Sequence, residues 1–194
     1  GPGWAERAVA QLEADARAAQ LAGATLPLTY KTTDKSRMIA FRGYAYTRTP
    51  SEVSGALMTR FDESTPQIWN VPLRDEIVPD LQQAAPKAGY LVPAAQAQMV
   101  AAKLRQHGVS YQVLSGAPGR LPVETFRATA VKFGAQSLEG RQTAAVQGEW
   151  QKEERVVGAG DLYVPVNQAK ARLVVALLEP RAPDSLLAWG SFNT

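Results

Sequence analysis

The spacing of hydrophobic residues near the start of the chain is typical of a helix. Between Trp4 and Leu21, apolar residues recur at helical intervals, charged residues occupy the other face, and alanine is frequent. Gly23 follows and ends the pattern. The sequence therefore predicts an amphipathic helix over residues 4–21.

Between Ala24 and Pro86 the pattern changes to short alternating runs. Each run carries β-branched, aromatic or leucine residues and is separated from the next by turn-forming residues, one such turn being 62–66. This arrangement predicts antiparallel strands. The predicted strands are Leu26 to Thr32, Met38 to Thr47, Ser54 to Arg60 and Gln67 to Leu73, with a further strand at 77–81 that Pro79 confines to a sheet edge.

The second half of the sequence combines strands with helices. Residues 88–93 and 109–114 are predicted strands on either side of a helix over 94–107. If the two strands share a sheet, they should run parallel with a right-handed crossover. The apolar face of this helix is predicted to consist of Ala97, Val100, Ala101 and Leu104.

Further elements follow towards the C-terminus. Period-two alternation predicts an antiparallel pair of strands at 123–133 and 141–150, and a last strand at 162–166. Asn167 is a candidate N-cap for a helix over 168–178, which Pro180 closes.

Together these elements predict a mixed α+β fold, in which an antiparallel β-rich first half is fused to a strand-helix-strand second half with a further C-terminal helix. We expect 1–22 to be an N-terminal helix or linker, 23–86 the β-rich part and 87–194 the mixed part. The chain has 194 residues, 45% of them hydrophobic, and can bury a core without disulfides. Residues 23–194 are therefore expected to form one compact unit.

The charged residues argue against nucleic acid as a partner. Twenty-one Lys and Arg face eighteen Asp and Glu with the signs interspersed, so the net charge is only +3. No basic cluster with interleaved aromatic residues is present. No apolar run approaches the roughly 20 residues that cross a bilayer, so no membrane span is expected. The lack of cysteine is compatible with either the cytoplasm or the periplasm.

Three aromatic residues are candidates for a ligand surface. Tyr44 and Tyr46 alternate along one predicted strand and so point the same way, while Trp69 lies on a neighbouring strand. A platform of this kind holds sugar rings or peptide side chains, although filling a core is the commoner role of such residues. The candidates for a surface that contacts another domain lie near the C-terminus and are Leu186, Trp189 and Phe192.

Several stretches resemble one known kind of protein segment. They are Arg37 to Tyr46, Thr65 to Asp75, Asp161 to Pro180 and Asp184 to Gly190. Together they resemble the region downstream of the catalytic domain in large bacterial zinc metallocarboxypeptidases of the carboxypeptidase A type. The resemblance implies an accessory region, with residues 1–22 joining it to the preceding domain.

The zinc chemistry of that family needs a His-x-x-Glu pair and a distant second histidine. This chain has a single histidine, His107, and no cysteine. His107 is a candidate general base or pH sensor, but its predicted place at the end of a helix favours a structural role at the negative end of the helix dipole. We therefore expect no catalytic residue, cofactor or metal site in this chain, and zinc in the catalytic domain.

The resemblance implies that the chain supports the catalytic domain of the same polypeptide and shapes substrate access. The alternative is a module that binds cell-wall peptide or carbohydrate and anchors a secreted hydrolase. An enzyme with an unrecognised site is a third possibility. No signal peptide opens the chain, and the resemblance implies a periplasmic or secreted location.

Overall fold

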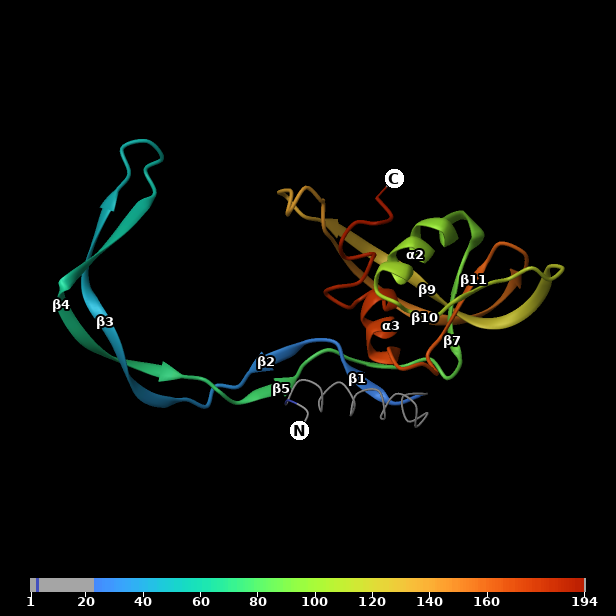
Figure 1. Ribbon diagram of the computed structural model, residues 1–194, viewed down its shortest axis with the longest axis horizontal. Helices are drawn as coiled ribbons and strands as arrows, with labels where there is room; N and C mark the ends of the chain where they lie inside the picture. Colours follow the sequence, from blue (N-terminus) through green and yellow to red (C-terminus); the bar gives the residue numbers. More distant parts are fainter. Residues whose placement is uncertain (1–2, 4–22, 194) are drawn as a thin grey trace. The chain divides into compact units, whose positions relative to one another are not determined.

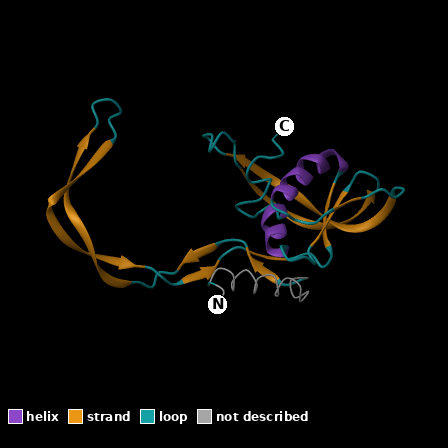
Figure 2. Cartoon of the chain, in the orientation of Figure 1, coloured by secondary structure: helices purple, strands orange, loops and turns teal. Residues whose placement is uncertain are grey.

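The computed structural model describes residue 3 and residues 23–193. The predicted helix over 4–21 lies outside these residues. The described residues contain eleven strands and two helices, α2 and α3 (Figures 1 and 2). Every paired strand runs antiparallel to its partner. The predicted mixed, β-rich α+β fold class is confirmed.

The chain divides into two compact units, where the sequence led us to expect one for residues 23–194. The first unit is Tyr30–Pro79, and the second consists of the residues before and after it. The predicted β-rich part, 23–86, therefore covers the whole first unit together with short strands of the second. Those strands are β1 (Thr25–Pro27) and its partner β6 (Gln82–Ala84), the latter not predicted.

The first unit is dominated by two long strands, β3 (Arg37–Pro50) and β4 (Leu57–Leu73), which pair along the whole of β3 and which we call the ribbon (Figure 1). Two short strands that pair with each other flank the ribbon in the sequence: β2 (Tyr30–Thr32) precedes it and β5 (Ile77–Pro79) follows it. No residue between Tyr30 and Pro79 is buried. The ribbon therefore has no hydrophobic core of its own.

The strands predicted at 54–60 and 67–73 are in fact parts of one continuous strand, β4. The predicted turn at 62–66 is instead an irregularity in that strand, where the register shifts between Tyr44 and Ala45 of β3. The Asp62 carboxylate accepts hydrogen bonds from the Ser64 backbone and hydroxyl groups and from the Thr65 hydroxyl. Residues 63–65 have no partner in β3, and these local bonds satisfy polar groups of Ser64 and Thr65 there.

The second unit is built around a small sheet with the order β7 (Gly89–Val92), β11 (Leu162–Pro165) and β8 (Gln112–Val113). The central strand, β11, is antiparallel to both neighbours, so β7 and β8 run parallel to each other. The predicted parallel relationship within one sheet is confirmed. However, β11 separates the two strands, which the sequence did not indicate.

Helix α2 (Ala94–Gln106) covers this sheet with the predicted apolar face. Ala97, Val100, Ala101 and Leu104 are all buried in the core. The helix ends as predicted, because Gly108 has a φ of 62° in the left-handed region that glycine tolerates.

Helix α3 (Ala171–Leu178) begins three residues later than the prediction of Gln168. The side chain of Gln168 accepts a hydrogen bond from the Ser110 backbone at 2.8 Å and donates to the carbonyl oxygens of Ser110 and Pro165. These bonds hold residues 166–170 in bends and turns before the helix begins. Asn167 does not cap the helix, and Lys170 occupies the N-cap position.

A second long hairpin, β9 (Gly119–Phe133) with β10 (Ala144–Val157), confirms the predicted antiparallel pair at 123–133 and 141–150. Its tip is a two-residue turn in which Glu139 and Gly140 both have positive φ, 51° and 76°. That combination is the type I′ turn, whose twist matches that of the flanking strands. Trp150 of β10 packs against the core.

Candidate functional site

The register of the ribbon sorts its side chains onto two faces. Pairs such as Ile39 with Val71 and Phe41 with Trp69 lie on one face, because residues two apart along a strand point the same way. We call this the aromatic face. Its apolar members between the start of β3 and the register shift are Ile39, Phe41, Trp69, Val71 and Leu73.

Aromatic rings meet around Trp69. The Phe41 and Trp69 rings are stacked at a centroid distance of 6.2 Å and an interplanar angle of 23°. The Tyr46 ring approaches Trp69 edge-on at 5.9 Å and lies 6.0 Å from the Phe61 ring. We call these four residues the aromatic cluster. Edge-on and stacked pairs of this kind stabilise each other beyond simple burial.

The position of the Trp69 indole depends on Gly43. A Cβ atom on residue 43 would lie 2.7–2.8 Å from three ring carbons of Trp69, closer than such atoms normally approach. The indole therefore packs directly over the Gly43 backbone. Its Nε1 donates a hydrogen bond to Gln67 Oε1 at 3.1 Å, which fixes the orientation of the ring.

The sequence prediction of a surface formed by Tyr44, Tyr46 and Trp69 agrees with this geometry at two positions. Tyr46 and Trp69 lie in the same cluster, whereas Tyr44 pairs with Pro66 and joins none of the ring contacts. Phe41 and Phe61 were missed by sequence reasoning. Their place in the cluster depends on the register between the two strands. The sequence shows that residues alternate within each strand, but this alternation does not specify the register.

Strand β3 is rich in arginine and contains no acidic residue. Arg37 pairs with Asp75 at 3.1 Å, and the guanidinium of Arg48 lies 5.5 Å from the centre of the Tyr46 ring. Within residues 23–193, Arg42 and Arg48 form no ion pair with a carboxylate. The strand thus presents uncompensated positive charge beside the aromatic cluster.

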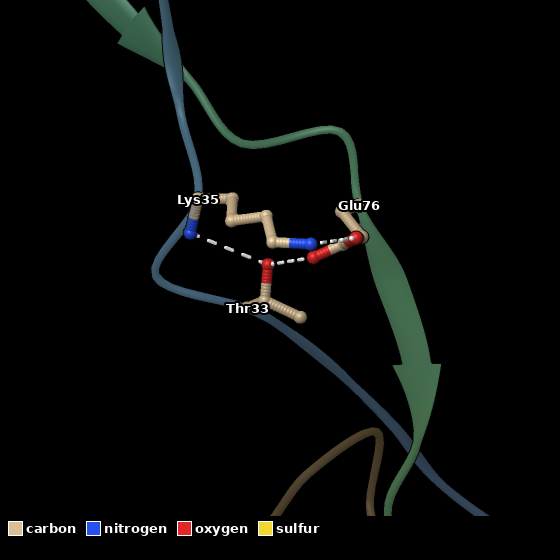
Figure 3. A network of polar contacts seen from close by, with 3 residues as sticks. All are labelled: Thr33, Lys35 and Glu76. Carbon is tan, nitrogen blue, oxygen red and sulfur yellow. Dashed lines mark hydrogen bonds and ion pairs between the residues drawn. The ribbon is translucent and has the colours of Figure 1, made fainter.

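A polar network joins the segments on either side of the ribbon (Figure 3). The Thr33 hydroxyl donates to Glu76, and Lys35 Nζ binds the other oxygen of the same carboxylate at 2.9 Å. Both hydrogen bonds lower the pKa of Glu76, and the bond from Thr33 has the larger effect. The network ties the chain entering β3 to the chain leaving β4, which fixes the register at this end of the ribbon.

The second unit contains a buried carboxylate, Glu179, directly after α3. It accepts hydrogen bonds from Trp150 Nε1 at 3.1 Å and from the Tyr90 hydroxyl at 3.4 Å. Burial raises the pKa of Glu179, and the bond from Trp150 partly opposes that shift. Burial, followed by the charge of Glu179, also raises the pKa of Tyr90.

The other candidate residues lie in the second unit. His107 is the C-cap of α2, the structural position that its sequence context suggested. Leu186 is buried in the core of its own unit, so it does not contribute to an exposed docking surface. Trp189 is half-buried and Phe192 is exposed.

The part of the chain that the structure describes contains no group of three or more His, Cys, Asp or Glu residues placed to hold a metal ion. Among the same residues, no helix combines the length and apolar character of a membrane span. No protein family, curated protein or solved structure matches this chain.

Proposed function

We propose that this chain is a non-catalytic accessory region of a larger zinc carboxypeptidase of the carboxypeptidase A type, and that it supports the catalytic domain and shapes access to it. The observation that carries the proposal is the aromatic face of the ribbon. Tyr30–Pro79 contains no buried residue, yet this face carries five large apolar side chains in adjacent positions. Phe41 is exposed, and Ile39, Trp69, Val71 and Leu73 are half-buried.

Such a face is stabilised when another surface covers it. Removing apolar surface from water contributes roughly 25 cal/mol per Å². A catalytic domain in the same polypeptide supplies that surface at a high effective concentration, so docking needs little intrinsic affinity. The ribbon is thus suited to lie against a neighbouring domain.

The sequence resemblance supports the same conclusion. Two of the stretches that carry it, Arg37 to Tyr46 and Thr65 to Asp75, contribute the paired residues of the aromatic face. A third, Asp161 to Pro180, contributes β11 and α3, which form much of the core of the second unit. The resemblance therefore falls on the docking face and on the scaffold.

The proposal assigns zinc and catalysis to the preceding domain and places the protein in the periplasm or outside the cell. The purified chain should then show no carboxypeptidase activity. It should also hold no stoichiometric zinc, because its single histidine and lack of cysteine do not provide the ligands of such a site. Elemental analysis that finds one tightly held zinc per chain, retained after His107→Ala, would overturn this assignment.

The docking role is tested by mixing the chain with the separately produced catalytic domain from the same reading frame. We expect association, measured by calorimetry, that is weakened by the double substitution Phe41→Ser and Trp69→Ser. Phe133→Ser is the matched control, because Phe133 is an equally exposed aromatic residue on the other hairpin. Equal weakening by all variants, or no association of the unaltered chain, contradicts the proposal.

A second candidate function is a module that binds cell-wall peptide or carbohydrate. The observation that favours it is the exposure of the rings around Trp69, since Phe41 is 51% and Tyr46 48% exposed. Exposed aromatic rings stack on sugars and on peptide side chains. Retention on peptidoglycan or polysaccharide that Trp69→Ala abolishes, in a chain that ignores the catalytic domain, would establish this function instead.

A further inference from the structure

The two outer edges of the ribbon differ in their capacity to bind another strand. Strand β4 carries Pro66 and Pro72, which pair with Tyr44 and Met38 of β3. Proline has no N–H, so it is tolerated in a strand where that group would point away from the partner. Both prolines therefore occupy pairs in which the backbone groups face outward, and the outer edge of β4 lacks two donors.

Along each strand, the backbone N–H and C=O groups point alternately towards the partner strand and outward, and this alternation also defines the outer edge of β3. Pairs two residues apart are equivalent in an antiparallel ladder. Ala40, opposite Asn70, is therefore of the same outward-facing type as Met38 and Tyr44, and so is Arg42. No proline occurs in β3 before Pro50, and among the described residues β3 pairs only with β4. The outer edge of β3 thus presents an unbroken set of donors and acceptors.

The charges of β3 limit what can bind along this edge. Three arginines and no carboxylate lie between residues 37 and 50. A second copy of β3 would add three more arginines and no carboxylate at this edge, and the β4 edge of a second copy lacks donors at its prolines. A strand that carries acidic side chains complements the edge better than a second copy of this chain does.

We propose that the outer edge of β3 between Met38 and Tyr44 binds an extended acidic peptide by strand addition. The main chain of the peptide continues the sheet and supplies affinity, while its alternate side chains supply specificity. On one face, apolar side chains of the peptide lie next to Ile39 and Phe41. On the other face, acidic side chains reach Arg42, which has no ion-pair partner among residues 23–193. The preferred ligand therefore alternates apolar and acidic residues.

The test uses the full chain and an end-capped peptide of about nine residues, a length that spans this edge, in which valine and glutamate alternate. A second peptide has lysine in place of every glutamate. Binding is followed by calorimetry and by the change in tryptophan emission, to which Trp69, opposite Phe41 of β3, contributes from the ribbon. The glutamate peptide is expected to bind at least roughly tenfold more tightly than the lysine peptide, a difference that one good charge contact accounts for.

Proline substitutions provide a matched pair for the edge itself. Ala40→Pro removes a donor from the outer edge of β3, whereas Asn70→Pro makes the same change directly across the ladder, on the outer edge of β4. We expect Ala40→Pro to weaken binding of the glutamate peptide at least roughly tenfold, and Asn70→Pro to leave it within about twofold. Arg42→Glu, which leaves the backbone intact, should reverse the preference towards the lysine peptide.

Three outcomes would overturn the proposal. The first is that the two proline variants weaken binding of the glutamate peptide equally and that the Arg42→Glu variant still prefers the glutamate peptide to the lysine peptide. The second is equal binding of the two peptides to the unaltered chain. The third is a dimer, seen by sedimentation, that Ala40→Pro abolishes, because a second copy would then be the occupant. The proposal does not depend on the accessory role, since peptide binding and association with the catalytic domain are measured separately.

Discussion

The indole nitrogen of Trp150 lies 3.1 Å from Glu179 Oε1, and this hydrogen bond links hairpin β9–β10 to the end of α3. Tyr90 of β7 donates to the other oxygen of the same carboxylate. The side chain of Glu179 is only 1% exposed, so the two donors replace most of its contact with water. One buried carboxylate thus connects three elements of the second unit.

Glu179 should make the stability of the chain depend on pH. Burial raises the pKa of its carboxyl above the ordinary value of 4.5, so the folded state holds a proton that the unfolded state has already released. The stabilisation is therefore complete below about pH 4.5 and is lost as the pH rises through the folded-state pKa. The free energy of unfolding should fall by up to about 1.4 kcal/mol for each pH unit in that window.

Glu179→Gln isolates this effect, because an amide keeps an acceptor for Trp150 but does not ionise. The comparison is made by urea unfolding of both proteins at pH values from about 4 to about 8. We expect the stability of the unaltered chain relative to Glu179→Gln to decline as the pH rises. Parallel pH profiles would show that Glu179 ionises as easily in the folded as in the unfolded state.

The packing of α2 gives a prediction about the core. Leu104 is fully buried at 0% exposure, and Leu91 on the adjacent strand β7 is 38% exposed. Leu104→Ala should cost on the order of 2 to 5 kcal/mol, because it removes buried apolar atoms and leaves a cavity. Leu91→Ala is the control and should cost much less. Denaturant melts measure both, and similar losses at the two positions would contradict the assigned helix face.

Gly43 is expected to control the arrangement of the aromatic cluster. Gly43→Ala places a methyl group within 2.8 Å of the Trp69 ring, so the indole must move from its position over residue 43, which disturbs its contacts in the cluster. The expected result is a loss of near-ultraviolet circular dichroism and a destabilisation of the ribbon by about 0.5 to 1.5 kcal/mol, the worth of an aromatic pair. Gly116→Ala is the control, because nothing lies within 4 Å of a Cβ atom there. An unchanged aromatic signal in Gly43→Ala would disprove the dependence.

The tip of hairpin β9–β10 offers a stabilising substitution. Glu139 has a φ of 51°, a conformation that most side chains disfavour and asparagine tolerates. Glu139→Asn creates the Asn-Gly pair preferred in type I′ turns and should raise the free energy of unfolding by about 0.5 kcal/mol or more. Ser137→Asn lies outside the two central positions and should have little effect. A thermal shift for Ser137→Asn as large as that for Glu139→Asn would contradict the turn assignment.

Local pattern alone determined much of the fold. The extent and buried face of α2 follow from helical spacing, and the hairpin of β9 and β10 follows from period-two alternation, because both patterns act over a few neighbouring residues. The glycine after α2 also follows from sequence, since only its neighbours and its own backbone freedom are involved. The lack of a second histidine and of cysteine is likewise a property of the sequence itself.

Other features were decided only by contacts between distant residues. The insertion of β11 between β7 and β8 depends on pairing across about 70 residues with β7 and about 50 residues with β8, which local periodicity does not specify. Helix α3 starts late because Gln168 binds Ser110, a partner supplied by another segment. The meeting of Phe41, Tyr46 and Trp69, and the outward edge of β3, follow from the register and from the register shift near Tyr44. A strand pattern specifies which residues alternate, but only the tertiary structure fixes which of them face each other.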